Sequence, residues 1–190
     1  MAAARGRRGH GEETREEILA VAEALLLERA SEEEVSIRAV ADAAGVTPPA
    51  IYRHFTDKAH LIFEVCSRQF ERLGAQVAGA FDPTEDPLKT LAELARAYGR
   101  FALANPEHYR IMFMGHADHT PEQYADELVT EGGSFAVLLQ VLQAAIDQGQ
   151  LHPELDDAEA LAFVLWEGVH GVASLAITKP NLPAPPFDDR

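Results

Sequence analysis

One segment of the chain, residues 36–58, constrains the fold most because its capping and turn residues follow a fixed order. Ser36 can cap a short helix with its hydroxyl, and Gly45 follows where a helix end favours a left-handed backbone. Thr47 can cap a second short helix, whose first position suits Pro48 because no N–H group is needed there. The order helix, glycine turn, helix predicts a helix-turn-helix, a motif that docks on DNA.

The apolar residues of this segment fit two short helices packed on a common core. Val40 faces inward from the first helix, and Ile51 and Phe55, four residues apart, face inward from the second. Asp57 can then cap a third helix. The polar residues between Ile51 and Phe55 are left to point away from the core.

The segment from about Thr14 to Lys58 resembles the DNA-binding domain of TetR/AcrR-family regulators. The matching features are an amphipathic helix over 14–29, the turn Ala-Gly-Val-Thr, and Ile-Tyr-Arg-His-Phe followed by Asp-Lys, all in the family's order and spacing. The resemblance implies ten residues at the DNA. Those at phosphate positions are Tyr52, His54 and Lys58; those near bases or adjacent backbone are Ser36, Arg38, Thr47, Pro48, Pro49, Ala50 and Arg53.

The tip of the second helix has little capacity to read bases by hydrogen bonding. Residues 47–50 include no amide or guanidinium group, and proline and alanine can only touch thymine methyl groups. Arg53 is the one strong candidate base reader. We therefore expect modest direct readout, with DNA shape contributing a large share of the specificity.

The acidic composition argues against a general nucleic-acid binder, because such domains are usually basic. The formal net charge is −15. Residues 1–60 hold eight Lys or Arg and eleven Asp or Glu, whereas residues 61–190 hold eight and twenty. Most of the acid thus lies outside the predicted DNA-binding domain, and the acids within it must face away from phosphate.

Prolines and capping residues divide the rest of the chain into helices, and no strand pattern competes with them. Asp86, Asn105, Thr120 and Asp156 are the expected caps. The expected helices cover 58–80, 87–104, 106–115, 121–149 and 157–178, with a break in the fourth near 132–134. The fold class is all-α, and the expected parts are a flexible basic arm at 1–13, a three-helix DNA-binding domain at 14–60, a helical domain at 61–180 and a proline-rich tail at 181–190.

The last expected helix is apolar enough that a membrane span must be considered. Its length is marginal, and the ionisable residues Glu167 and His170 near its centre would be costly in lipid. A buried helix is the simpler interpretation. The segment 166–171 also resembles the Trp-His-Gly signature of one subclass of TetR-type ligand domains, and the segment 105–113 resembles the same subclass.

The resemblance implies that the helical domain at 61–180 forms a homodimer and holds an unknown, apolar small-molecule effector. Each candidate residue is also compatible with an ordinary core position. Glu167 and His170, three residues apart, could orient a ligand or lie at the dimer seam, and seam packing is the first choice. The candidate ligand residues are Tyr98, Phe101, Tyr109, Met112, Phe113, Phe135, Trp166 and His170.

The sequence suggests neither an enzyme nor a metalloprotein. It has no phosphate loop, serine elbow or metal-binding helix motif, and even His116 and His119 lack partners at compact ligand spacing. The lone Cys66 and an amino terminus without an apolar core fit a cytoplasmic, bacterial protein. We therefore expect no cofactor, metal or membrane partner.

The sequence leads to one function and two alternatives. The main hypothesis is a homodimeric regulator that binds a palindromic double-stranded DNA operator as a repressor and releases it when a small effector binds. The alternatives are an activator of the same family and a helical protein-interaction module that does not bind DNA.

Overall fold

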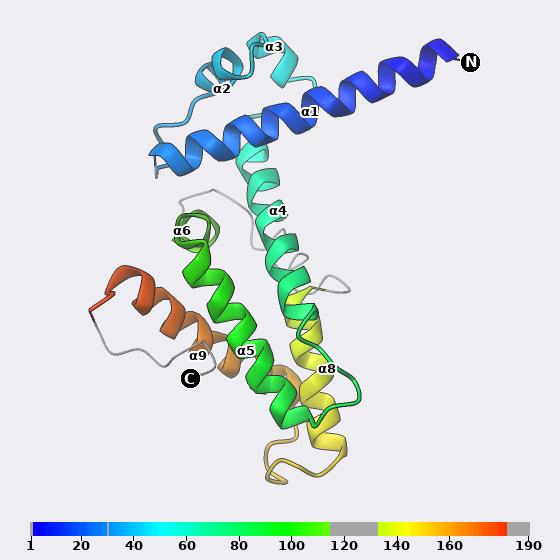
Figure 1. Cartoon of the computed structure of the whole chain (residues 1–190), viewed down its shortest axis with the longest axis vertical. Helices are drawn as coiled ribbons and strands as arrows, with labels where there is room; N and C mark the ends of the chain where they lie inside the picture. The colour runs from blue at the N-terminus through cyan, green and yellow to red at the C-terminus, as the bar shows by residue number, and fades with distance from the viewer. Residues whose placement is uncertain (1, 30, 115–132, 182–190) are drawn as a thin grey trace. The chain divides into compact units, whose positions relative to one another are not determined.

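The computed structural model describes residues 2–29, 31–114 and 133–181, with the side chains of the first helix described from Gly11 onward. These residues form helices and no strands, as the sequence predicts (Figure 1). The chain divides into two compact units. The head unit combines Met1–Gln69 with Glu107–Thr120, and the body unit combines Phe70–Pro106 with Pro121–Arg190.

The head unit begins with α1, Ala2–Arg29. Its buried side chains include Ile18, Ala22 and Leu26, which share one helical face and fit the predicted amphipathic helix. The helix starts at Ala2 and not near Thr14, so residues 2–13 are helical here and not an irregular arm. Three consecutive alanines near the start explain the extension, since alanine has the highest helix propensity.

The predicted helix-turn-helix is present as α2, Ile37–Ala43, and α3, Pro48–Ile51. The turn between them contains Gly45, whose φ of 66° lies in the left-handed region. The inward residues are those the sequence pattern indicates, since Val40 and Ile51 are completely buried. The spacing of turn and core residues therefore predicts this motif correctly.

Two further helices belong wholly or partly to the head unit. Asp57 caps α4, Lys58–Ala78, by accepting a hydrogen bond from the backbone N–H of His60 at 2.8 Å. The first half of α4 lies in the head unit and the second half in the body unit. α6, Pro106–Met114, lies in the head unit except for its first residue, and His108 Nε2 lies 2.9 Å from Glu23 Oε1 of α1.

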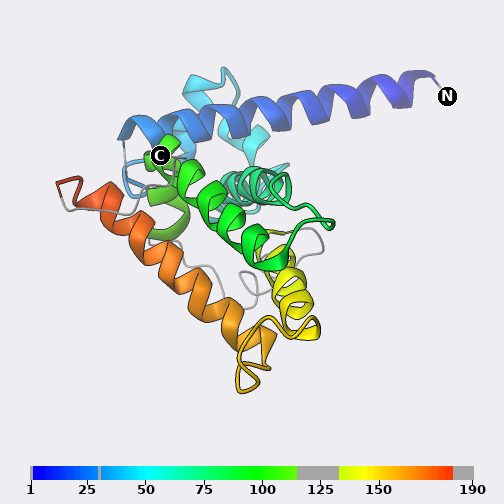
Figure 2. The same cartoon turned by 60° about the horizontal axis from the view of Figure 1, so that its bottom comes forward.

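The body unit contains α5, Pro87–Ala104, α8, Ser134–Asp147, and α9, Ala158–Thr178, which pack against one another (Figure 2). Asp86 caps α5 as predicted, accepting bonds from Leu88 and Lys89, and these hydrogen bonds hold the pKa of its carboxyl below the ordinary value. α9 is capped by Asp157 and not by the predicted Asp156. The reason is that Asp157 sits directly before the first helical turn, where its side chain accepts from Ala160.

Some predictions fall outside the described residues. These are the cap at Thr120, the first part of the helix expected over 121–149, and the tail beyond residue 181. Where the chain is described again, α8 begins at Ser134, directly after the pair of glycines that predicts a helix break. The predicted boundaries of the helices over 87–104, 106–115 and 157–178 are confirmed to within one residue.

Candidate DNA interface and ligand cavity

The tip of α3 exposes a hydroxyl that no helix cap uses. Pro48 and Pro49 lack N–H groups, and the N–H of Ala50 donates to the backbone oxygen of Thr47 at 2.8 Å. The Thr47 side chain therefore makes no capping hydrogen bond, which corrects the sequence expectation. Because Thr47 is exposed, its hydroxyl is available to a partner outside the head unit.

Ser36 differs from Thr47 although both precede short helices. The Ser36 hydroxyl oxygen accepts a hydrogen bond from the N–H of Ala39 at 3.1 Å, so this residue caps α2 as predicted. A serine cap satisfies a backbone donor that would otherwise be left without a helical partner. Ser36 thus supports the fold of the head unit, whereas the Thr47 side chain does not.

This difference predicts that alanine substitution changes the stability of the protein at Ser36 but hardly at Thr47. Ser36→Ala should lower the free energy of unfolding by about 1 kcal/mol because a cap is lost, while Thr47→Ala should change it by less than about 0.5 kcal/mol. Urea denaturation of the two variants, followed by circular dichroism, measures both values. Equal losses would contradict the assignment of Thr47 as a residue without a capping role.

Three candidate DNA residues form an exposed polar side of the motif. Tyr52 is 55% exposed, and Arg38 and Arg53 are also exposed. No ion pair holds either arginine within the described part of the chain. The side chains on the opposite side, Ile51 and Phe55, fill the core, so the motif separates packing residues from residues that can meet a partner.

Two other candidate DNA residues are half-buried. His54 lies beside the ring of Phe55, with 6.3 Å between ring centroids. The Lys58 ammonium donates to the backbone oxygen of Glu32. An ammonium group carries three donors, so this bond orients Lys58 and leaves donors for a phosphate.

Part of the acid in the head unit is neutralised by local ion pairs. Arg15 lies 2.7 Å from Glu64, and Arg68 pairs with Glu16. The Arg15 guanidinium also stacks over the ring of Phe55, 5.4 Å from its centroid. These pairs join α1 to α4 and place positive charge directly beside Glu16 and Glu64.

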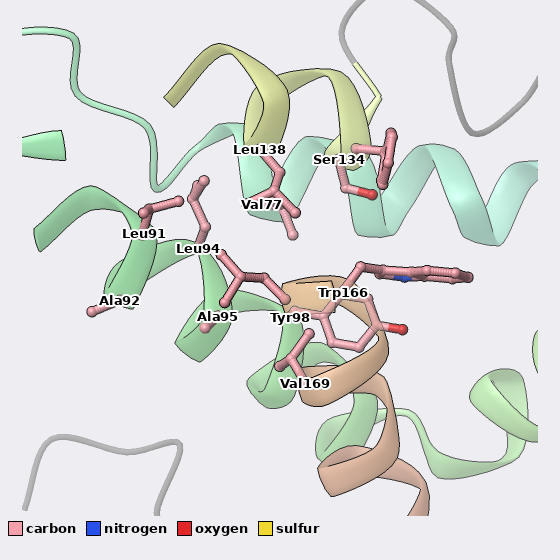
Figure 3. Close-up of a pocket in the computed structure, with 12 residues that line it drawn as sticks. Val77, Leu91, Ala92, Leu94, Ala95, Tyr98, Ser134, Leu138, Trp166 and Val169 are labelled. Carbon is pink, nitrogen blue, oxygen red and sulfur yellow. The ribbon is translucent and has the colours of Figure 1, made fainter. Parts of the chain in front are cut away.

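The body unit contains a partly open cavity of about 300 Å³, lined by residues of α4, α5, α8 and α9 (Figure 3). Its walls are aliphatic and aromatic, and among the described residues that line it none is charged. In Figure 3, Leu91 and Ala92 lie at one end of the set of lining residues, and the Trp166 indole and the Tyr98 hydroxyl lie at the other end. The lining residues are Val77, Leu91, Ala92, Leu94, Ala95, Tyr98, Ser134, Phe135, Leu138, Leu165, Trp166 and Val169.

A tyrosine and a histidine from different helices meet beside this cavity. The Tyr98 hydroxyl lies 3.0 Å from His170 Nδ1, and the His170 ring lies 5.6 Å from the Trp166 ring between centroids. Burial lowers the pKa of His170, so the imidazole is neutral at neutral pH. His170 therefore lies beside the cavity wall and Glu167 is exposed, and the dimer-seam position preferred from sequence stays a prediction.

The predicted ligand residues separate into two groups. Tyr98, Phe135 and Trp166 line the cavity, and His170 bonds to the first of them. The others are not among the lining residues. Phe101 is buried in the body unit, and Tyr109, Met112 and Phe113 belong to the head unit with α6.

Sequence reasoning missed most of the cavity wall because it favoured large aromatic side chains. Leu91, Ala95 and Tyr98 follow one another at helical spacing on α5, and this pattern could have identified the inner face of that helix. The pattern alone does not distinguish a filled core from a cavity, since the same residues line both.

α9 exposes several apolar side chains, and Val164, Gly168 and Leu175 share one helical face. Val164 is 65% exposed and Leu175 is 52% exposed, and Phe163 and Leu165 are above 40%. A Cβ atom placed on Gly168 would meet no atom within 4 Å. By length and composition α9 could also cross a membrane, but one such helix is only weak evidence of a membrane span.

A helix-turn-helix with exposed polar residues, together with a separate helical unit that holds an apolar cavity, is the arrangement expected of a ligand-regulated DNA-binding protein. Residues 18–65 match the pattern of the bacterial regulatory proteins of the tetR family, and residues 91–189 match that of the tetracyclin repressor-like C-terminal domain. The second match covers more than half of the chain. The chain belongs to the TetR family of DNA-binding transcriptional regulators, as the resemblance implies.

Individual relatives agree with this assignment. The chain is 29% identical over 109 residues to the transcriptional activator FasR of Mycolicibacterium smegmatis, covering 57% of the chain and 49% of FasR, about half its length. It is 26% identical over 145 residues to the repressor KstR2 of Mycobacterium tuberculosis, covering 75% and 71%. The structure of FadR from Bacillus subtilis with stearoyl-CoA superposes with a TM-score of 0.72 at 12% identity, covering 88% of the chain and 89% of FadR.

Proposed function

We propose that two copies of this chain bind a near-palindromic operator and repress transcription until an apolar small molecule occupies the cavity of the body unit. The observation that carries the proposal is the exposed side of the helix-turn-helix, where Thr47, Tyr52 and Arg53 are available to DNA. Phosphate contacts from Tyr52, His54 and Lys58 would position the head unit, and Arg53 would read a base. The two half-sites would lie about 34–36 Å apart or a multiple of that.

The exposed apolar face of α9 supports the dimer. Val164 and Leu175 would bury apolar surface away from water in a dimer interface. The open space at Gly168 would allow a helix of the second copy to pack closely. An apolar patch of this kind on a soluble protein usually marks an interaction site. The exposed Glu167 within the same helix disfavours lipid as the partner, so we infer a cytoplasmic dimer.

Two relatives bear on the direction of regulation and the effector. KstR2 is named a repressor and FasR an activator, so activation is the alternative outcome. FadR binds stearoyl-CoA, a ligand with a long apolar chain, and the apolar walls of the cavity suit such a chain. We propose regulation without catalysis, since the family is one of transcriptional regulators and none of the described cavity-lining residues is charged.

A genome-fragment pull-down with the purified protein tests the proposal. Regulators often bind beside the genes they control, so we expect a few enriched fragments that share a near-palindrome. Retention should fall as salt is raised, because phosphate contacts release counterions. A folded dimer that retains no fragment at low salt would instead favour a protein-interaction module. A reporter gene behind the enriched fragment then distinguishes repression from activation.

A further inference from the structure

The cavity of the body unit combines apolar walls with a few uncharged polar groups. Binding pockets generally combine apolar walls with a few polar groups that fix orientation. The polar side chains on this wall are Tyr98, Ser134 and Trp166, all uncharged, and no lysine, arginine, aspartate or glutamate is among the described lining residues. A charged group against these walls would lose part of its hydration without gaining an opposite charge from the described lining residues.

The polar group that can orient a ligand is held in place from outside the cavity. His170 Nδ1 lies 3.0 Å from the Tyr98 hydroxyl, which fixes where that hydroxyl points. Because burial lowers the pKa of His170, the imidazole supplies no positive charge to a carboxylate at neutral pH. A hydroxyl bonded to a neutral imidazole can still donate to or accept from one ligand oxygen.

From these walls we propose that the cavity selects an uncharged apolar molecule with one hydrogen-bonding oxygen, which meets the Tyr98 hydroxyl. The part of the effector inside the cavity is then an alcohol, ketone, aldehyde or ester, and not a free carboxylate. This selection rests on the proposed ligand-regulated function and adds the chemical class of the ligand. The volume of about 300 Å³ accommodates a chain of roughly ten carbon atoms.

The protein carries its own reporter for this selection. Trp166 lines the cavity and is the only tryptophan of the chain, so tryptophan fluorescence comes from this one position in the cavity wall. Two probes with the same chain length, 1-decanol and decanoate, differ at pH 7.5 only in the polar end. Titrations followed by Trp166 emission give the affinity for each probe. We expect 1-decanol to bind at least about 10-fold more tightly than decanoate.

Three variants show whether the probe sits where the structure predicts. Ala95→Phe fills the cavity and should abolish the response, whereas Ala104→Phe adds the same ring at an exposed position of α5 and should leave it unchanged. Tyr98→Phe removes the hydroxyl alone and should weaken the binding of 1-decanol about 3- to 10-fold. All three measurements use the full chain.

Two results would overturn the proposal. Decanoate binding as tightly as 1-decanol would show that the cavity accepts a charge. No response to either probe, from a protein that still retains its DNA fragments, would show that the cavity is not a site for uncharged ligands while the DNA-binding function stands. Loss of DNA retention itself would be a failure of the proposed function, and the fluorescence titration detects ligand binding independently of it.

Discussion

The Val164→Asp variant should be monomeric and should bind its operator at least about 100-fold more weakly than the original chain. Val164 is the most exposed of the large apolar residues on α9, and a carboxylate there would be buried without a partner in the proposed dimer. Two head units linked in a dimer bind DNA more tightly than one, by on the order of 10²- to 10⁴-fold, and a monomer loses this gain in affinity. Light scattering with size-exclusion chromatography and a gel-shift titration measure the two effects.

Leu88→Asp is the matched control for this variant. Leu88 is also apolar and 44% exposed in the body unit, but it lies on α5 and outside the proposed seam. We expect this control to stay dimeric and to bind DNA normally. If Val164→Asp also stays dimeric with unchanged affinity, the exposed face of α9 is not the seam.

Alanine substitution of Arg53 and Lys58 should separate base reading from phosphate contact. Arg53→Ala should relax the preference at one base pair of each half-site by about 1–3 kcal/mol. Lys58→Ala should weaken binding to all sequences alike and reduce the salt dependence by about one phosphate contact. Binding to a library of operators with single substitutions, at two salt concentrations, measures both effects.

A uniform loss in both variants would contradict the role of Arg53 as a base reader. Arg38→Ala serves as a comparison, because Arg38 is an exposed arginine at the start of α2, a position near the DNA backbone. Its loss should follow the pattern of Lys58 and not that of Arg53.

The sequence predicts the helices well because their boundaries depend on local chemistry. Ser36, Asp57 and Asp86 are short polar residues before apolar runs, and each caps a helix in the structure. Thr47 shows where such reasoning fails. A cap needs a donor as well as an acceptor, and the two prolines after Thr47 remove the donors.

The cavity and its polar pair depend on contacts between distant segments, which periodicity does not reveal. Tyr98 and His170 are 72 residues apart, and nothing in the local pattern of either helix indicates that they meet. The aromatic residues of α6 look equally suitable in the sequence, but Tyr109 is completely buried within the other unit. Only packing distinguishes the two sets.

The most direct test of the account is the affinity of the purified protein for an enriched genomic fragment against a scrambled fragment of equal length. We predict that the enriched fragment binds at least about 10³-fold more tightly at physiological salt, and that its affinity falls steeply as salt is raised. Equal affinities for the two fragments, or retention that does not respond to salt, would contradict the claim that this chain is a sequence-specific DNA-binding regulator.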